Sequence, residues 1–373
     1  MNAMRRLEGG LLLGMTLLLF LFPAPCARGA RDGLILCRDL LVPALFPFFV
    51  LSSLLIATGT AGRLAGPLTR FTRPCLGIGR AGTAALLLGL VGGYPVGLRT
   101  LAELRSRSAC SLKEAGRAAL FCNNCGPAFF IGAAGAGIFG SREAGLLLMA
   151  ANGLAAMLLA LGLRLACGTV PEDTALPKAE VLPLAQVFAD CVSGAFSSVL
   201  GVCAYVILFS VLSSLGEALG LLSLIQGCLA PLFPGPQGAA LSRSLTLGLL
   251  EISTGTAALK DAAGSFAALP LAAFLLGWGG WSVHGQSLTF LRQAGGGFGP
   301  YLAAKAVHGL LSAGVLLLLL RVFPLSLPAM ASAGPVFPAP LPGRALTAVW
   351  LAWGLVFFLR GEKSGGKSRR NRV

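Results

Sequence analysis

The sequence predicts an all-α polytopic membrane protein of about ten transmembrane segments, in two related halves whose helices are broken by Gly and Pro. Apolar and aromatic residues make up 55% of the 373 residues, and charged residues only 12%. Soluble domains carry about 25% charged residues, so this chain lacks the charge to cover a water-exposed surface of its size. Uncharged stretches such as 144–163 and 191–216 reach the roughly 20 residues that cross a hydrocarbon core. These observations exclude a soluble enzyme, a disordered scaffold and a nucleic-acid-binding domain.

The charge that remains is strongly basic. The chain has 29 Lys and Arg against 14 Asp and Glu, a net charge of +15. In a membrane protein this excess indicates topology and contact with anionic lipids rather than nucleic acid. The densest cluster is the Gly/Ser-spaced tail at 361–373, which predicts a cytoplasmic C-terminus. We therefore expect a multi-pass protein of the cell membrane with lipids as partners.

The chain divides at changes in composition. At the start, Arg5 and Arg6 precede an apolar run that ends near Pro23. This pattern is typical of a signal-like segment or of an uncleaved first span with its N-terminus inside, and we favour the span. The predicted segments are an N-terminal span or signal-like segment (1–30), a first membrane repeat (31–167), a polar linker (168–183), a second membrane repeat (184–323), a Pro-rich loop with a final span (324–360) and the basic cytoplasmic tail (361–373).

A weak internal repeat relates the two halves. Gly89 aligns with Gly248, and Asn152 aligns with His308 at nearly the same sequence separation. Chance matches between leucines would not keep this register, so one duplicated unit is indicated. The basic residues of the loops leave the relative orientation of the halves open, and we favour an inverted repeat. Asn152 and His308 are predicted to form hydrogen bonds between helices.

Four apolar helices contain a Gly- or Pro-rich centre. Such residues interrupt the backbone hydrogen-bond ladder, and interrupted backbone inside a bilayer persists only where protein covers it or where it lines a cavity. Interrupted segments at matching positions of two halves are typical of a transporter's binding site. The residues expected at the breaks are Gly92, Gly93, Pro95, Gly97, Gly126, Pro127, Gly255, Gly279 and Gly280.

Glu251 is the sharpest functional candidate. It lies in a charge-free stretch between Arg243 and Lys260, where an ionisable group usually marks an ion or substrate pathway. The hydroxyls of Ser253 and Thr254 follow it, so the segment is predicted to bind a small polar solute or a coupling ion, H⁺ or Na⁺. The alternatives are a neutral carboxylic acid hydrogen-bonded to a neighbouring helix and a carboxylate paired with an arginine.

Asn123 and Asn124 lie in an apolar stretch before a Gly-Pro stop. Their amides offer donors and acceptors to a polar ligand, or they hold helices together by hydrogen bonds. Tyr94 adds a ring to the first broken centre, whose glycines also have the spacing of a helix-packing motif.

An aromatic and polar patch ends the fourth broken segment. Trp278 and Trp281 precede His284 and Gln286. The patch is expected either to contact a ligand, with His284 as a proton relay, or to form an interfacial aromatic belt.

No enzyme motif accompanies these residues. The sequence lacks a GxSxG, HExxH or P-loop pattern, and the CxxC at Cys122 and Cys125 has no second ligand pair. We therefore expect no enzymatic activity, no metal and no cofactor.

Four strings of residues resemble a known family. They are LVPALFPFFVL at 41–51, GGYPVG at 92–97, FCNNCGPAFF at 121–130 and GWSVHGQ at 280–286, within a similarity that covers roughly 33–323. They are similar to sporulation integral membrane proteins of the nucleoside-recognition, or Gate, domain group. The motif residues carried over are Tyr94, Pro95, Asn123, Asn124 and His284, whereas Cys125 stands where the family commonly has a small hydroxyl residue.

The resemblance implies a role in spore formation. It implies a multi-pass membrane location and a transporter-like carrier or channel for a small polar solute needed for the spore cortex. The alternative is a non-transporting membrane assembly factor for cortex or coat machinery.

Overall fold

The computed structural model describes residues 2–169 and 183–325, and within these ranges the chain is helical and contains no β-strand. Three helices are long and apolar enough to cross a membrane: α8 (Arg142–Cys167), α9 (Leu184–Ala218) and α15 (Phe298–Val322). The count rises to five if each of two bent helix pairs forms one span. The all-α class is confirmed and the apolar helices agree with a membrane location, whereas the figure of about ten spans stays a prediction.

Parts of the expected organisation fall beyond the described residues. The Pro-rich loop and final span at 324–360, apart from its first two residues, and the basic tail at 361–373 lie outside them. Most of the linker at 168–183 does as well.

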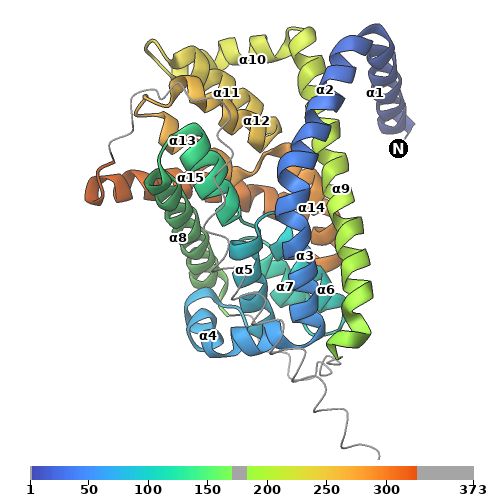
Figure 1. Cartoon of the computed structure of the whole chain (residues 1–373), viewed down its shortest axis with the longest axis vertical. Helices are drawn as coiled ribbons and strands as arrows, with labels where there is room; N and C mark the ends of the chain where they lie inside the picture. Colours follow the sequence, from blue (N-terminus) through green and yellow to red (C-terminus); the bar gives the residue numbers. More distant parts are fainter. Residues whose placement is uncertain (1, 170–182, 326–373) are drawn as a thin grey trace, which may run out of the picture.

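Two long helical runs lie antiparallel along the molecule (Figure 1). The first continues from α2 through a π-helical turn into α3, and the second is α9. A Cβ atom on Gly29 or Gly33 would stand 2.8 Å from the Cα of Val211 or Ile207 in α9, so only glycine allows this approach. The elements of the first run and the helix before it are α1 (Asn2–Leu21), α2 (Pro23–Leu36), the π-helical turn (Cys37–Leu41) and α3 (Val42–Ala57).

The boundary expected at residue 30 falls inside α2. Pro23 occupies the first position of that helix, where a missing backbone amide is tolerated, so it starts a helix as well as ending the one before. The axes change direction by 97° at this point.

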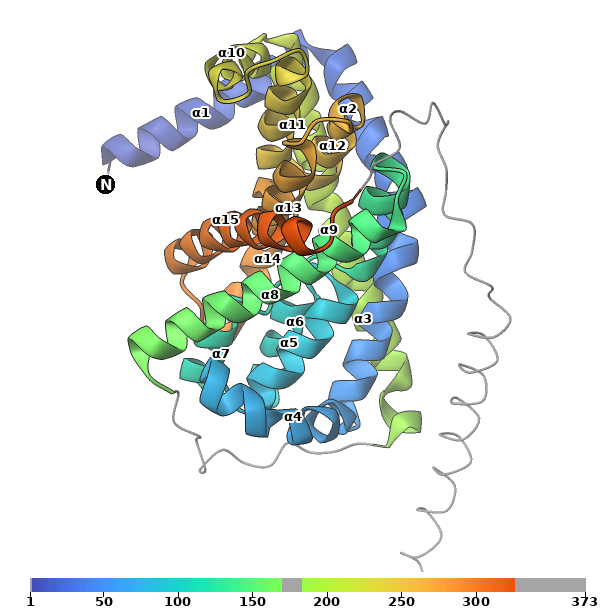
Figure 2. The same cartoon turned by 90° about the vertical axis from the view of Figure 1, so that its left-hand side faces the viewer.

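Each long run is followed by a short helix, and the two short helices lie at opposite ends of the molecule. α4 (Thr60–Leu76) follows α3 at one end, and α10 (Leu221–Leu229), with the 3₁₀ turn Ala230–Leu232, follows α9 at the other (Figures 1 and 2). Gly59 and Gly220 precede them with φ of 69° and 73°, a conformation that side chains disfavour. The chain therefore turns sharply at the same point after each run.

All four predicted interruptions are present. Each separates two short helical pieces that contribute backbone to the interior of the molecule. The pairs are α5 (Arg80–Gly92) with α6 (Val96–Ser106), α7 (Leu112–Ala118) with the π-helix Ala128–Ile138, α11 (Gly238–Leu250) with α12 (Ile252–Ala257) and its 3₁₀ extension Ala258–Ala262, and α13 (Ala268–Trp278) with α14 (Gly280–Ala294).

Two glycines expected at the interruptions lie inside helices instead. Gly97 is in the first turn of α6, and Gly255 is in α12. A Cβ on Gly97 would collide with the carbonyl oxygen of Cys122, and a Cβ on Gly255 with the Cα of Gly248. The expectation is wrong at these two positions, because the close approach of two backbones, rather than a special φ, requires glycine there.

α8 and α15 pack against each other in antiparallel directions, and α13 packs on both (Figure 2). His308 Nε2 donates to the Asn152 carbonyl oxygen at 3.0 Å, and Asn152 Nδ2 donates to Ser312 Oγ at 3.4 Å. The predicted hydrogen bonding between these two helices is confirmed, although the contact between the two aligned residues uses the Asn152 backbone rather than its side-chain amide.

Candidate functional site

A small cavity of about 90 Å³ lies where the four interruptions meet. Each interruption contributes to its wall, and the first turns of α3 and the middle of α9 complete it. We call it the central cavity. Its lining is formed by Leu41, Leu45, Gly92, Gly93, Tyr94, Cys125, Gly126, Ala128, Phe129, Val202, Val206, Glu251, Ile252, Ser253, Ser282, Val283 and Gln286.

Glu251 lines this cavity and also ends α11 and begins α12. Its side chain is 2% exposed. Ser253 N donates to Oε1 at 3.0 Å and Thr254 N donates to Oε2 at 2.7 Å, so the carboxylate is the N-cap of α12. Within the described ranges, the hydrogen bonds of the carboxylate go to its own helix and no arginine forms an ion pair with it.

Two polar side chains of α14, next to the fourth interruption, line the same cavity, and each has an oxygen atom without a hydrogen-bond partner among the described residues. Ser282 and Gln286 line it, and both are buried. Ser282 Oγ and Gln286 Oε1 have no hydrogen-bond partner among the described residues. A buried polar oxygen normally has a partner, so these two atoms mark the places where a polar ligand gains most from binding.

The two asparagines lie outside the lining of the central cavity. Asn123 Nδ2 donates to Ser287 Oγ at 3.0 Å and to the Tyr301 hydroxyl at 2.8 Å, which links the second interruption to α14 and α15. Asn124 Nδ2 donates to the carbonyl of Phe121 at 3.0 Å, within its own loop. The geometry of Asn123 is that of a tie between helices, one of the two functions expected for it.

His284 and Thr254 are also displaced from the cavity wall. The imidazole is buried, and ring centroids of Trp278, Trp281 and Tyr301 lie 4.4, 5.9 and 5.7 Å from its own. Trp278 and His284 are buried, whereas Trp281 is 40% exposed at the surface. Thr254 contributes its amide to the Glu251 cap and donates its hydroxyl to the Glu251 carbonyl at 3.1 Å. Of the predicted residues, the structure therefore brings Tyr94, Glu251, Ser253 and Gln286 together.

Lys305, which sequence analysis missed, connects the interruptions beside this cavity. Its side chain is fully buried in α15. The ammonium donates to the Tyr94 hydroxyl at 3.1 Å, to the Asn123 carbonyl at 2.9 Å and to His308 Nδ1 at 3.0 Å. His308 Nε2 faces a carbonyl and must carry its ring proton, so Nδ1 is the acceptor.

These bonds use all three protons of the ammonium without a counter-ion. Lys305 has no carboxylate within ion-pair distance among the residues that the structure describes. Tyr94, which accepts from it, donates in turn to the Leu276 carbonyl at 2.8 Å, just before the fourth interruption. The available sequence signal was that Lys305 is the only charged residue between Arg292 and Arg321, the same criterion that identified Glu251.

Comparisons with known proteins agree with the resemblance seen in the motifs. Residues 40–170 match the family model described as Gate, nucleoside recognition. The chain is similar to the sporulation integral membrane protein YlbJ of Bacillus subtilis (strain 168), with 29% identity over 321 residues that cover 80% of this chain and 78% of that protein. No solved structure matches the chain.

Proposed function

We propose that this homologue of a sporulation integral membrane protein is a transporter-like carrier or channel, which moves a small polar solute needed for formation of the spore cortex. The central cavity is the proposed solute site. It rests on one observation: four helix interruptions from distant parts of the sequence converge on one buried space that holds polar groups without partners. Such convergence is the arrangement by which transporters expose backbone and side-chain polar atoms to a passenger.

The size of the cavity narrows the class of solute. Pockets that enclose drug-sized ligands span about 300–1,000 Å³, several times the roughly 90 Å³ found here. In this conformation the site accommodates an ion or a very small polar molecule. The family description favours a nucleoside as one candidate, and a nucleoside requires the interruptions to move apart first.

The order and direction of the helices support two inverted halves. In each half a long run is followed by an end helix, two broken helices and a long helix. The matching helices run in opposite directions, as an in-plane pseudo-twofold axis requires: α3 with α9 in Figure 1, and α8 with α15 in Figure 2. The aligned residues Asn152 and His308 contact each other, which is expected of equivalent positions close to such an axis.

The first interruption and the third also have similar local packing. Gly89 faces Gly97 across the α5–α6 break, and its aligned residue Gly248 faces Gly255 across the α11–α12 break. In both places two half-helices approach through glycine. This similarity supports the duplicated unit.

Glu251 is the proposed ion-linked residue. Its carboxylate lines the cavity while holding the first turn of α12, so protonation or a bound cation would act on the solute site and on the helix together. We propose H⁺ or Na⁺ as the coupling ion. The remaining proposals are a multi-pass position in the cell membrane with the C-terminus inside, anionic lipids at the basic tail, and no enzymatic activity.

Uptake by purified protein in liposomes tests the proposal. Radiolabelled uridine, adenosine, glycine and malate are offered with an imposed Na⁺ or pH gradient. We expect uptake of at least one of these solutes, and we expect Gln286→Leu to abolish it. Gln226→Leu on α10, away from the cavity, is the matched control and should transport normally. Absence of uptake under every gradient would contradict the proposal.

A sporulation assay distinguishes the carrier hypothesis from the assembly-factor hypothesis. In spore-forming cells that depend on this protein, Gln286→Leu should produce defective cortex while removal of residues 361–373 should have little effect. The opposite pattern would favour the assembly factor, which acts through loops and the tail.

A further inference from the structure

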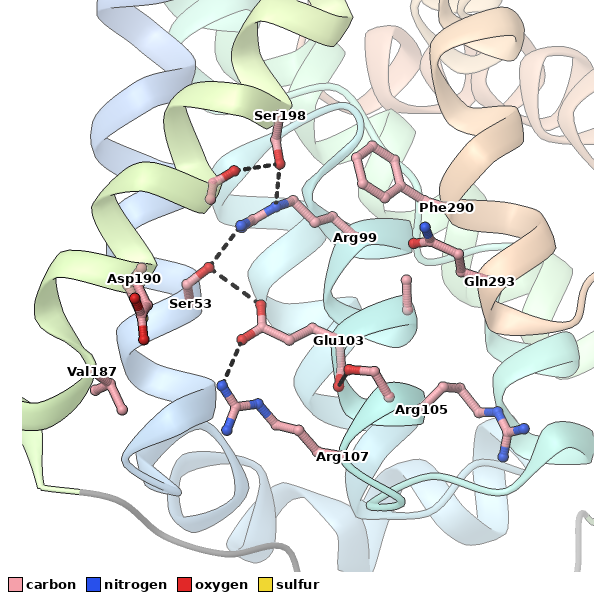
Figure 3. Close-up of a pocket in the computed structure, with 14 residues that line it drawn as sticks. Ser53, Arg99, Glu103, Arg105, Arg107, Val187, Asp190, Ser198, Phe290 and Gln293 are labelled. Atoms are coloured by element: carbon pink, nitrogen blue, oxygen red, sulfur yellow. Dashed lines mark hydrogen bonds and ion pairs between the residues drawn. The ribbon is translucent and has the colours of Figure 1, made fainter.

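A second, larger cavity of about 790 Å³ is lined by residues of α3, α6, α9 and α14. The end of α3 and the start of α9 that contribute to it lie near α4 (Figure 1). We call it the outer cavity. Polar and charged side chains from α3, α6 and α9 line much of it, and Gln293 and Phe290 of α14 close one side (Figure 3). No residue lines both cavities.

Three helices line both cavities at successive levels. α3 contributes Leu45 to the central cavity and Ser53, two turns on, to the outer one. α9 contributes Val202 and Ser198, and α14 contributes Gln286 and Phe290, in each case one turn apart. One turn of a helix rises about 5.4 Å. The two cavities are therefore stacked along a common axis between these helices.

Arg99 lines the outer cavity, and it bonds to Phe49 and Ser198, each one helical turn from a residue of the central cavity. It is 8% exposed and lies on α6, which begins beside the central cavity and carries Glu103 at the outer one. Its guanidinium lies 5.0 Å from the ring centroid of Phe49, a fully buried residue one helical turn from Ser53 on α3. This pair therefore lies on the side of the outer cavity that is next to the central one.

The hydrogen bonds of Arg99 connect its own helix, α6, to α3 and α9. Nε donates to Ser198 Oγ of α9 at 3.1 Å, Nη1 to the Phe49 carbonyl of α3 at 3.1 Å and Nη2 to Ser53 Oγ at 2.8 Å. Ser53 continues the chain of bonds to Glu103, which pairs with Arg107 at 3.4 Å (Figure 3). All the acceptors that Arg99 itself contacts are uncharged, so the bonds are individually exchangeable for water or solute oxygens.

We propose that the outer cavity is the aqueous vestibule of the solute route through the central cavity, and that Arg99 is the gate between them. This inference rests on the proposed transport function. In the closed state the guanidinium bridges α3 and α9 across the path. Release of its bonds to Ser53 and Ser198 lets the two helices separate, and Glu103 at the vestibule wall offers the freed guanidinium an alternative partner.

Natural cysteines provide the test, because one lies in each space. Cys191 lines the outer cavity and Cys125 the central one, while Cys75 is exposed on α4. Each is retained alone after replacement of the other nine of the ten cysteines. A membrane-impermeant methanethiosulfonate reagent is added to one face or the other of oriented vesicles, and the rate of labelling is measured.

We expect Cys191 to react from one face only, the face that also labels Cys75. From that face Cys125 should react slowly, and Arg99→Ala should raise its rate about tenfold or more, because loss of a single charge-assisted hydrogen bond shifts a closed–open equilibrium by that factor. Ser53→Ala combined with Ser198→Ala should raise it less. Arg105→Ala is the matched control, because Arg105 lines the outer cavity but donates to Cys110 of its own segment. Unchanged labelling of Cys75 shows that each variant is folded and inserted.

Three results would overturn the gate. They are a Cys191 that reacts from neither face, a Cys125 rate that is the same with and without Arg99, and an equal rise with Arg105→Ala. Labelling requires no solute, so the two proposals fail separately. Solute uptake without access to Cys125 from the Cys191 face refutes the gate alone, whereas gated access without any uptake refutes the carrier.

Discussion

Replacement of Lys305 by Met tests whether the buried ammonium holds the broken helices together. Met has nearly the same length and volume, so the packing around α15 is kept and the hydrogen bonds alone are removed. Three bonds disappear, to the Tyr94 hydroxyl, the Asn123 carbonyl and His308 Nδ1. The last two acceptors then stay buried without partners.

The magnitude follows from two opposing terms. Each stranded acceptor costs about 1–3 kcal/mol, so the two together destabilise the fold by about 2–6 kcal/mol. Removal of the ammonium from the interior offsets part of this loss of stability, because a buried charge carries a desolvation penalty of several kcal/mol. We expect a net loss of about 1–3 kcal/mol for Lys305→Met. Lys305→Ala should lose about 2 kcal/mol more, because it also leaves a cavity.

Thermal unfolding in detergent, followed by size-exclusion chromatography, measures the order of stability. Wild type should be the most stable and Lys305→Ala the least. Lys113→Ala in the exposed first turn of α7 is the control and should stay within about 0.5 kcal/mol of wild type. If Lys305→Met equals or exceeds wild type, the ammonium costs more than its bonds return, and the structural argument for Lys305 is refuted.

A double-mutant cycle isolates one arm of this network. Tyr94→Phe removes the hydroxyl that accepts from Lys305 and donates to the Leu276 carbonyl. Combined with Lys305→Met it should show a coupling energy of about 1–2 kcal/mol, typical of residues that share a hydrogen bond. Additive effects would mean that the Lys305–Tyr94 contact contributes nothing to stability.

Three further predictions concern helix ends and contacts. Glu251→Gln keeps one acceptor for the amides at the start of α12, so the protein level should be preserved while uptake is lost. Glu251→Ala removes both acceptors and should also destabilise the protein by about 1–2 kcal/mol in the same unfolding assay. Normal uptake by the Glu251→Gln variant would show that Glu251 has no part in the mechanism. Gly97→Ala should reduce the folded yield strongly, because its Cβ meets the Cys122 carbonyl; wild-type yield would contradict the backbone contact. Gly33→Leu should lower the melting temperature by separating α2 from α9 at Ile207, and no change would show that the two runs do not depend on that contact.

Sequence reasoning located the interruptions because their cause is local. Gly93 and Gly279 end helices with a positive φ, Pro95 and Pro127 stand directly before the helices that follow them, and Glu251 caps α12 with its side chain. Each of these effects depends on a few neighbouring residues. Gly97 and Gly255 were misassigned because a glycine that serves a distant contact looks the same in sequence as one that serves a turn.

The composition of the site was harder to predict. Glu251, Ser253, Tyr94 and Gln286 do line the central cavity, but Asn123 is directed to Ser287 and Tyr301. An amide in an apolar segment serves a ligand or a neighbouring helix equally well, and the choice depends on which helices pack beside it. The contacts of Lys305 and Arg99 also could not be predicted from the sequence, because both side chains bond to segments far away in the chain.

By itself the sequence determined an apolar, all-helical chain, the places where its helices break and a charged residue at one of those breaks. Hydropathy, helix-breaking residues and unpaired charge act over a few residues, so they can be read along the chain. Only the tertiary structure decided that the four breaks meet, that Lys305 connects them and that Arg99 bonds α6 to α3 and α9 beside the outer cavity. These features arise from packing between helices that lie far apart in sequence, where burial and the available hydrogen-bond partners are properties of the assembled fold.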